Sequence, residues 1–233
     1  MSVRTVAPAL PEPADKARSV ESMFDRIAPR YDALNRALTF RMDVGWRRAT
    51  VDALGLTPDA RVLDLACGTG DLCRTLADAG YRPIGADFSA GMLHAATTPA
   101  PLVRADALRL PFADGAFDGL TCGFALRNFV ALEPVFAECA RVVRPGGRIA
   151  LLDVAEPSSA LVRSVHGAWF RHVVPFVGGL FSDRDAYRYL PASTAYLPDV
   201  TELVGLVAAA GVRAVSHREF FFGTAQLVTG TRA

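Results

Sequence analysis

Ten consecutive residues decide the fold class of this chain: Val62-Leu63-Asp64-Leu65-Ala66-Cys67-Gly68-Thr69-Gly70-Asp71. The first half is a short apolar run typical of a buried strand, and the second half is a loop that contains two glycines. Glycine lets the backbone approach a ligand closely, and the first N–H groups of a following helix have no partner inside that helix. The stretch therefore predicts a strand, a ligand-binding loop and a helix.

Outward from this stretch, short apolar runs alternate with helical patterns. The runs that we predict as strands are 61–66, 83–87, 102–105, 117–122 and 148–153, and the predicted helices are 72–79, 91–96 and 133–143. Arg144-Pro145-Gly146-Gly147 is a strong turn signal after the last helix. Such alternation is typical of βαβ units with a parallel sheet, so the fold class is α/β, a doubly wound Rossmann-like domain.

The chain after Asp153 departs from the alternation. Residues 156–198 are rich in arginine, histidine and aromatic side chains, and we interpret them as an insertion on the substrate side of the sheet. A helix at 199–210 and two β-like runs, 212–221 and 224–229, follow, with Gly223 at their junction. This hairpin predicts a terminal antiparallel strand in a mostly parallel sheet.

The N-terminal part is helical in pattern, except for its first residues. We expect residues 1–18, rich in proline and alanine, to be a flexible arm without chemistry, and 19–56 to form helices separated at Pro29. Residues 19–233 then make up a single domain.

Composition excludes several classes of protein. The formal net charge is +1 and charged residues are 21% of the chain, so there is no electrostatic case for a nucleic-acid partner. The four cysteines have no paired spacing and no nearby histidine, which predicts reduced packing residues and no metal site. The absence of an apolar leader favours a cytoplasmic protein, and the oligomeric state is left open.

Three acids follow three consecutive predicted strands. Asp64 stands inside the first strand end, where a carboxylate suits an α-amino group better than a pyrophosphate, which favours an amino-acid-bearing nucleoside over a dinucleotide. Asp87 closes the second strand, where a carboxylate can accept both ribose hydroxyls. Asp106, followed by Ala107, is placed to accept from an adenine amino group. Each acid alone also fits a helix cap, so the combination carries the prediction.

The sequence resembles the ubiquinone/menaquinone-biosynthesis C-methyltransferase family from about Met23 to nearly its end. The matching motifs are Met23-Phe24-Asp25-Arg26-Ile27-Ala28-Pro29-Arg30-Tyr31-Asp32, Trp46-Arg47-Arg48, the glycine loop, Asp87-Phe88-Ser89, Leu110-Pro111-Phe112, Leu126-Arg127-Asn128, Arg144-Pro145-Gly146-Gly147 and Tyr187-Arg188-Tyr189-Leu190-Pro191. The sequence departs from the family pattern at two places. Gly123 stands where the family often has a Ser that is linked to the cofactor, and the closing hairpin has no His before Gly230. Both departures bear more on the identity of the substrate than on that of the cofactor.

The resemblance implies S-adenosylmethionine (SAM) as cofactor and methylation of a ring carbon of a prenylated demethylmenaquinol. The lack of a metal-ligand cluster in the sequence predicts turnover without a metal. By this analogy, Thr69, Asp87 and the pair Asp106 and Ala107 match cofactor-contacting positions. The full set that we predict for the cofactor is Asp64, Gly68, Thr69, Gly70, Asp87, Phe88, Asp106 and Ala107.

The candidates for chemistry lie beyond the cofactor loop. Arg127 and Asn128 follow the fourth predicted strand and are expected to orient the substrate ring, with Tyr31 closing over it. Asp153 ends the fifth strand and is a candidate base, although a strand-end aspartate equally caps a turn.

The predicted insertion contains His166, His172 and an apolar group around Trp169 and Phe170. We interpret the histidines as solvated. The apolar group is too short and broken to span a bilayer, and it fits plain packing on the sheet, a tunnel for a prenyl tail, or peripheral membrane contact.

Three other functions stay open at this stage. An O- or N-methyltransferase of a small molecule would keep the cofactor site and change the pocket. A nicotinamide oxidoreductase is disfavoured, because Cys73 replaces the third glycine of the dinucleotide motif and Asp64 is acidic. A binding protein without catalysis would share the fold.

Overall fold

The computed structural model describes residues 13–157, 159, 162, 164, 189 and 193–233. Its helices are α1 (Pro13–Ile27), α2 (Tyr31–Leu38), α3 (Met42–Asp52), α4 (Asp71–Asp78), α5 (Ala90–His94), α6 (Leu132–Val142) and α10 (Val200–Ala209). Its strands are β1 (Arg61–Leu65), β2 (Arg82–Asp87), β3 (Leu102–Arg104), β4 (Phe117–Gly123), β5 (Val143–Val154), β6 (Val212–Phe220) and β7 (Ala225–Arg232). Short 3-10 helices lie at Ala28–Arg30, Leu126–Asn128, Ser193–Tyr196 and Phe221–Gly223.

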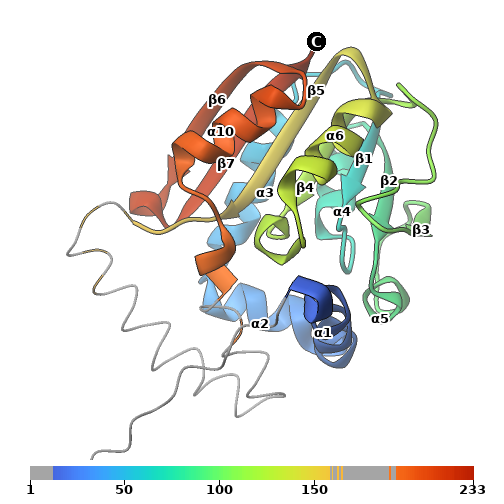
Figure 1. The fold of residues 1–233 in the computed structure, drawn as a ribbon. Coiled ribbons are helices and arrows are strands. Elements are labelled where there is room, and N and C mark those ends of the chain that lie inside the picture. The colour runs from blue at the N-terminus through green and yellow to red at the C-terminus, as the bar shows by residue number, and fades with distance from the viewer. Residues whose placement is uncertain (1–12, 158, 160–161, 163, 165–188, 190–192) are drawn as a thin grey trace, which may run out of the picture.

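The strands form one seven-stranded sheet in the order β3-β2-β1-β4-β5-β7-β6. Neighbours from β3 to β5 pair in parallel, whereas β7 is antiparallel to both β5 and β6. Helices α1 and α2 lie across the carboxyl ends of the parallel strands (Figure 1). The predicted α/β class and the single antiparallel strand are confirmed, and this edge is where such sheets bind ligands.

Two predicted boundaries were wrong. Helix α1 begins at Pro13, so the expected arm at 1–18 overlaps a helix, and residues 1–12 lie outside the described residues. Proline is tolerated in a first helical turn, and Lys16 in the next turn donates to the carbonyl of Phe129 at 2.7 Å. This contact, distant in sequence, stabilises a helix start that composition alone does not reveal.

The second wrong boundary is the turn predicted at 144–147. These residues belong to β5, because Phe117 of β4 pairs with Val143 and Gly119 pairs with Arg148. The extra residues on β5 form an irregularity in the ladder instead of a connection between elements. The predicted insertion at 156–198, including His166 and His172, falls largely outside the described residues.

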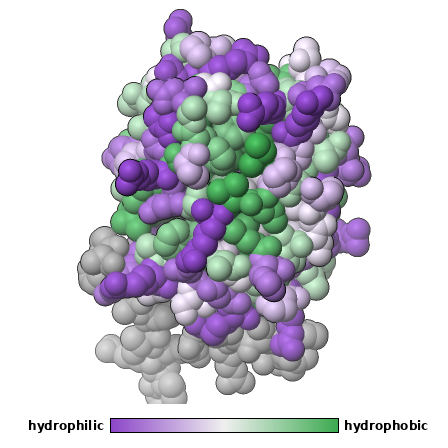
Figure 2. Space-filling view, turned by 90° about the vertical axis from the view of Figure 1, so that its right-hand side faces the viewer, coloured by the Kyte–Doolittle hydropathy of each residue, from purple (hydrophilic) through white to green (hydrophobic). Residues whose placement is uncertain are grey.

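Seen from the β3 edge of the sheet, polar side chains surround a central area of apolar residues (Figure 2). On the described part of the chain, Phe40, Phe221 and Phe222 are also exposed, by 67%, 55% and 72%. Apolar surface is thus present outside the core, as is usual where half of the residues are hydrophobic.

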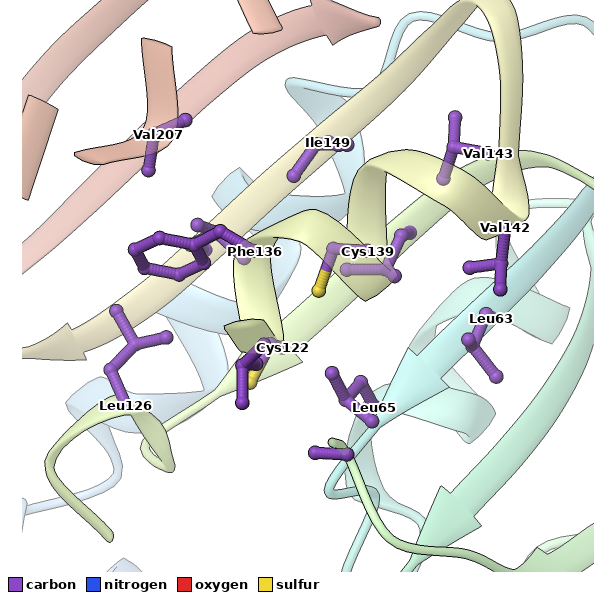
Figure 3. Close-up of a cluster of buried hydrophobic side chains, with 14 of the residues drawn as sticks. Leu63, Leu65, Cys122, Leu126, Phe136, Cys139, Val142, Val143, Ile149 and Val207 are labelled. Carbon is purple, nitrogen blue, oxygen red and sulfur yellow. The ribbon is translucent and has the colours of Figure 1, made fainter. Parts of the chain in front are cut away.

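The core lies on both faces of the sheet, because neighbouring strand residues point to opposite sides. On one face, Leu63 and Cys122 pack beneath Phe136 and Cys139 of α6 (Figure 3). On the other face, Val62 packs with residues of α3 and α4. All four cysteines are buried and free, which confirms that they are packing residues. The two helical layers hold the carboxyl ends of β1 to β4 in fixed relation.

Candidate functional site

The loop after β1 adopts a backbone that most residues avoid. Ala66, Gly68 and Gly70 have φ values of 54°, 55° and 86°, in the left-handed region where glycine is least strained. A Cβ atom on Gly70 would lie 2.5 Å from Cγ2 of Thr98, so this position also needs glycine for space. The loop turns the chain from the strand into α4 and brings Gly68 and Thr69 to the edge of a cavity.

This cavity lies at the carboxyl ends of β1, β2, β3 and β4. Of the predicted cofactor residues, seven border it: Asp64, Gly68, Thr69, Asp87, Phe88, Asp106 and Ala107. Gly70 is outside this lining and shapes the loop. The strand ends thus bring together residues that are spread over 44 positions of the sequence, from Asp64 to Ala107.

Asp87 ties the first loop to the second. Its Oδ2 atom accepts a hydrogen bond from Gly68 N at 2.8 Å, and its Oδ1 atom accepts one from Ser89 N at 2.8 Å. Burial raises the pKa of this carboxyl, while the backbone donors act in the opposite direction. Each carboxylate oxygen has a second lone pair, so Asp87 retains acceptors for two hydroxyl groups of a ligand.

The other two acids differ in their surroundings. Asp106 is exposed, and its Oδ1 atom accepts from Leu108 N at 2.9 Å, so part of its role is to hold the turn that presents Ala107. Asp64 is fully buried, and it accepts from Thr121 Oγ1 at 2.9 Å and from Cys73 Sγ at 3.3 Å. Burial raises the pKa of Asp64 to about 7.

Helix α1 covers the cavity as a lid. Four of its residues border the cavity: Ala17, Val20, Glu21 and Phe24. Asp25 attaches the lid to α5, because its Oδ1 atom accepts from Ser89 Oγ at 2.5 Å and from Gly91 N at 2.8 Å. Glu21 adds an ion pair with Arg104 at 2.8 Å. Sequence reasoning quoted Asp25 within a motif but did not identify this contact.

The predicted chemistry residues fall into two groups. Tyr31 and Asn128 border the cavity, as does Gly123. Tyr31 packs edge-on against Phe24, with ring centroids 5.7 Å apart, and burial raises the pKa of its phenol. The amide oxygen of Asn128 accepts from Tyr189 Oη at 3.2 Å. Both cavity residues are therefore uncharged groups that can offer hydrogen bonds to a ring oxygen.

Arg127 and Asp153 lie together behind this surface, outside the described cavity lining. Their side chains form a buried ion pair, and Asp153 is 0% exposed. Arg127 also donates to Phe124 O at 2.8 Å and to Ser193 Oγ at 3.2 Å. Sequence reasoning placed both residues at this edge but did not foresee the pairing. The geometry does not leave Asp153 a free carboxylate facing the cavity.

Comparisons with known proteins identify the family to which this chain is similar. A model of the ubiE/COQ5 methyltransferase family matches residues 13–232. A demethylmenaquinone methyltransferase of Thermus thermophilus is 43% identical over 220 residues, covering 90% of this chain and 100% of that protein. The Mycolicibacterium vanbaalenii protein of the same name is 43% identical over 216 residues, covering 92% and 95%.

Solved structures share the fold at low identity. A SAM-dependent methyltransferase of Thermotoga maritima has a TM-score of 0.65 at 18% identity, covering 91% of this chain and 99% of that one. Haemonchus contortus phosphoethanolamine N-methyltransferase 2, solved with S-adenosyl-L-methionine, has a TM-score of 0.59 at 13% identity, covering 80% and 52%. The sheet order, the glycine loop at its edge and the family match over nearly the whole chain agree, and the chain belongs to the ubiE/COQ5 methyltransferase family.

Proposed function

We propose that this protein transfers the methyl group of SAM to a ring carbon of demethylmenaquinol and releases menaquinol and S-adenosylhomocysteine. The observation that carries the proposal is that one cavity is lined both by the predicted cofactor residues and by Tyr31 and Asn128. The cofactor residues are those of the glycine loop and the aspartates at the ends of β1, β2 and β3. The substrate class follows from relatives about 40% identical that are named demethylmenaquinone methyltransferases.

The residues at the strand ends fit a nucleoside with an amino-acid tail. Asp87 would accept the two ribose hydroxyls with the lone pairs that Gly68 N and Ser89 N leave unused. Asp106 and Ala107 would meet the adenine edge, and Phe88, which is 38% exposed, offers an apolar side chain beside it. Thr69 and Gly68 would run along the middle of the ligand.

The bound cofactor supplies an electrophilic methyl group on a sulfonium. A quinol ring carbon would form the new C–C bond as the C–S bond breaks, and the proton that this carbon loses would pass to solvent. The protein has to hold the ring carbon in line with that methyl group, since positioning supplies much of the rate in such a displacement. The lid helix α1 and the aromatic side chains of the cavity would exclude water during this step.

Tyr31 and Asn128 would orient the ring through its oxygen atoms. The carbon becomes more nucleophilic as the neighbouring hydroxyl loses its proton, and hydrogen-bond donors stabilise the negative charge that develops. Because its pKa is raised, Tyr31 keeps its proton at neutral pH and acts as a donor. We assign Arg127 and Asp153 a positioning role, because their ion pair holds the 3-10 helix that carries Asn128.

We also propose that the protein works without a metal, and that it is cytoplasmic and meets its substrate by peripheral contact with a membrane. The described residues contain no group of three metal-ligating side chains and no helix long and apolar enough to cross a bilayer. The proposed substrate carries a prenyl chain that partitions into a bilayer, and this property of the substrate supports peripheral contact. Loss of activity with a chelator, restored by a divalent ion, would contradict the first of these two points.

The deciding experiment is methyl transfer from labelled SAM to a chemically reduced, short-chain demethylmenaquinone, with the product located by mass spectrometry. The proposal predicts one new methyl group on a ring carbon. A methyl group on oxygen would overturn the C-methyltransferase assignment, and an NADH-dependent reaction would place the protein in another class. If SAM binds measurably but no product forms, the assignment of the acceptor is wrong and the assignment as a methyltransferase stands.

A further inference from the structure

Lys16 is the only lysine among the 25 lysine and arginine residues of the chain. It lies in the lid helix α1 and is 4% exposed. Its Nζ atom donates to the carbonyl oxygen of Phe129 at 2.7 Å and lies 3.6 Å from the centroid of the Tyr196 ring. Arginine occupies all other lysine-or-arginine positions, so the one compact ammonium side chain of the protein is enclosed between a carbonyl and an aromatic ring.

The partners of Lys16 belong to the part of the cavity that we assign to the acceptor. Phe129 follows Asn128, and both border the cavity, whereas Lys16 is outside its described lining. Tyr196 ends a short 3-10 helix that contacts the 3-10 helix carrying Asn128. Lys16 therefore contacts the outer side of the wall that presents Asn128, and it does not reach the cavity itself.

Helix α1 is attached to the protein on two sides. On the cofactor side, Asp25 accepts hydrogen bonds from α5. On the acceptor side, Met23 packs in a buried cluster with Tyr189, whose hydroxyl donates to Asn128. Because positions seven apart share one face of a helix, Lys16 continues the row of Met23 by two turns toward the N-terminus. Lys16 thus holds the N-terminal end of the lid on the acceptor side.

The burial of Lys16 favours one position of the lid without adding much stability. Among the described residues no carboxylate pairs with its ammonium, and burial lowers its pKa to about 8. The ionisable side chains of the adjoining cluster are the phenols of Tyr31, Tyr189 and Tyr196, and Asp15 of α1 is exposed in an ion pair of its own. Buried polar groups that specify one arrangement at a cost in stability are known from other proteins.

We propose that Lys16 is a positioning residue, which sets the register of the lid on the acceptor side so that the closed lid and the amide of Asn128 take one defined arrangement around the substrate ring. The carbonyl of Phe129 and the ring of Tyr196 fix the place of the ammonium. The cost of burying this charge keeps the closed lid able to open. The inference rests on the proposed function, since it concerns the acceptor of the methyl group.

The test compares Lys16→Met with the wild type in methyl transfer from labelled SAM to reduced, short-chain demethylmenaquinone. Methionine keeps an apolar side chain and removes the charge and the donor. We expect kcat to fall about tenfold, because a hydrogen bond from a charged donor is lost and the ring is held less precisely. The affinity for S-adenosylhomocysteine, measured by calorimetry, should stay within about twofold of wild type.

Arg18→Met is the matched control. Arg18 lies on the same helix, pairs with Asp15, and has a side chain that is 80% exposed. Its substitution also removes one positive charge from α1. It should change neither kcat nor the affinity for S-adenosylhomocysteine.

Urea unfolding separates positioning from plain structural support. Loss of a merely structural contact should lower the urea midpoint, whereas Lys16→Met should keep a midpoint at pH 7 no lower than that of wild type, since the buried charge goes with the hydrogen bond. The unfolded chain holds the lysine proton up to about pH 10.5, and the folded chain loses it near pH 8. The folding equilibrium constant of the wild type should therefore rise about tenfold relative to the variant from pH 7.5 to pH 9.

The single lysine also allows a measurement without any variant. Protein labelled with ¹³C only in lysine gives one side-chain Cε signal in an NMR titration. A pKa near 8 for this signal supports the enclosed ammonium. Titration near 10.5, the ordinary value, would overturn the inference.

The outcomes of the kinetic test are distinct. If the wild type transfers no methyl group to the quinol, the proposed function fails and the inference fails with it. If the wild type is active and Lys16→Met has the same kcat, the inference alone is wrong. A lower kcat together with a lower urea midpoint, or a variant that does not fold, would show a purely structural role and would also overturn the inference.

Discussion

Tyr189 donates a 3.2 Å hydrogen bond to the amide oxygen of Asn128, across 61 positions of sequence. Because that oxygen is occupied, the NH₂ group of Asn128 is left for other partners, and Asn128 borders the cavity. Tyr189 thus fixes which end of the amide is available to a substrate. Tyr189 is therefore a positioning residue. The sequence placed it in a family motif but did not indicate this role.

Tyr189→Phe should therefore slow the methyl transfer and leave cofactor affinity unchanged. Loss of one hydrogen bond of about 1 kcal/mol corresponds to about a fivefold fall in kcat. Steady-state kinetics and calorimetry with S-adenosylhomocysteine measure the two effects separately. Tyr81→Phe is the matched control, because the Tyr81 hydroxyl donates to Leu56 O at 3.3 Å and does not border the cavity. If Tyr81→Phe lowers kcat as much as Tyr189→Phe does, Tyr189 has no positioning role.

Asp87→Ala should weaken binding of both S-adenosylhomocysteine and methylthioadenosine. Both ligands carry the ribose, so loss of its buried charged acceptor should cost about 1.5 to 3 kcal/mol, or roughly a factor of 10 to 100, in each case. Unchanged affinity by calorimetry would show that the ribose assignment is wrong.

Asp25→Ala should loosen the lid. The substitution removes the acceptor for Ser89 Oγ and Gly91 N, the contacts that hold α1 on α5. We expect faster amide hydrogen exchange in α1 and a faster release of bound S-adenosylhomocysteine. The control is Asp15→Ala, also on α1, where the aspartate pairs with Arg18 and is 63% exposed. If Asp25→Ala leaves exchange in α1 as it is in the wild type, the lid is held by other contacts.

Asp153→Asn should destabilise the folded protein strongly. It leaves the buried guanidinium of Arg127 without its counter-charge, and breaking such a pair costs about 3 to 5 kcal/mol. The comparison is Asp118→Asn, which breaks an exposed pair with Arg144 and should cost less than about 1 kcal/mol. Urea unfolding of both variants measures the difference. Similar values for the two would mean that the Arg127–Asp153 pair contributes little to stability.

The free energy of unfolding should depend on pH through the titration of Asp64. Its pKa in the folded protein is raised to about 7 by burial, against about 3.8 when exposed. Between these pH values the folded chain holds a proton that the unfolded chain has lost, so the free energy of unfolding falls as pH rises. Asp64→Asn cannot titrate. From pH 5 to pH 8 the wild type should lose about 2 to 3 kcal/mol relative to this variant. A constant difference between the two proteins would contradict the assignment.

The alternation of apolar runs and helical patterns was sufficient to predict the α/β class, because strand and helix periodicities depend on nearby residues. The predicted strands that lead into the glycine loop and Asp87 agree with β1 and β2 within one residue. Local patterns failed where distant contacts decide the backbone. In helix α1, which begins before the predicted boundary, Lys16 donates to the distant Phe129 O. Residues 144–147 belong to β5, where the pairing with β4 shifts in register.

By itself, the sequence determined the order of elements, the loop conformation that glycines 68 and 70 permit, and the meeting of Asp64, Asp87 and Asp106 at one edge, since parallel strands end on the same side. Only the tertiary structure decided which charges neutralise one another. Arg127 pairs with Asp153, Asp25 fastens α1 to α5, and Asp71 pairs with Arg36, Arg47 and Arg74. These relationships depend on distances between side chains far apart in the chain, which no local pattern of residues encodes.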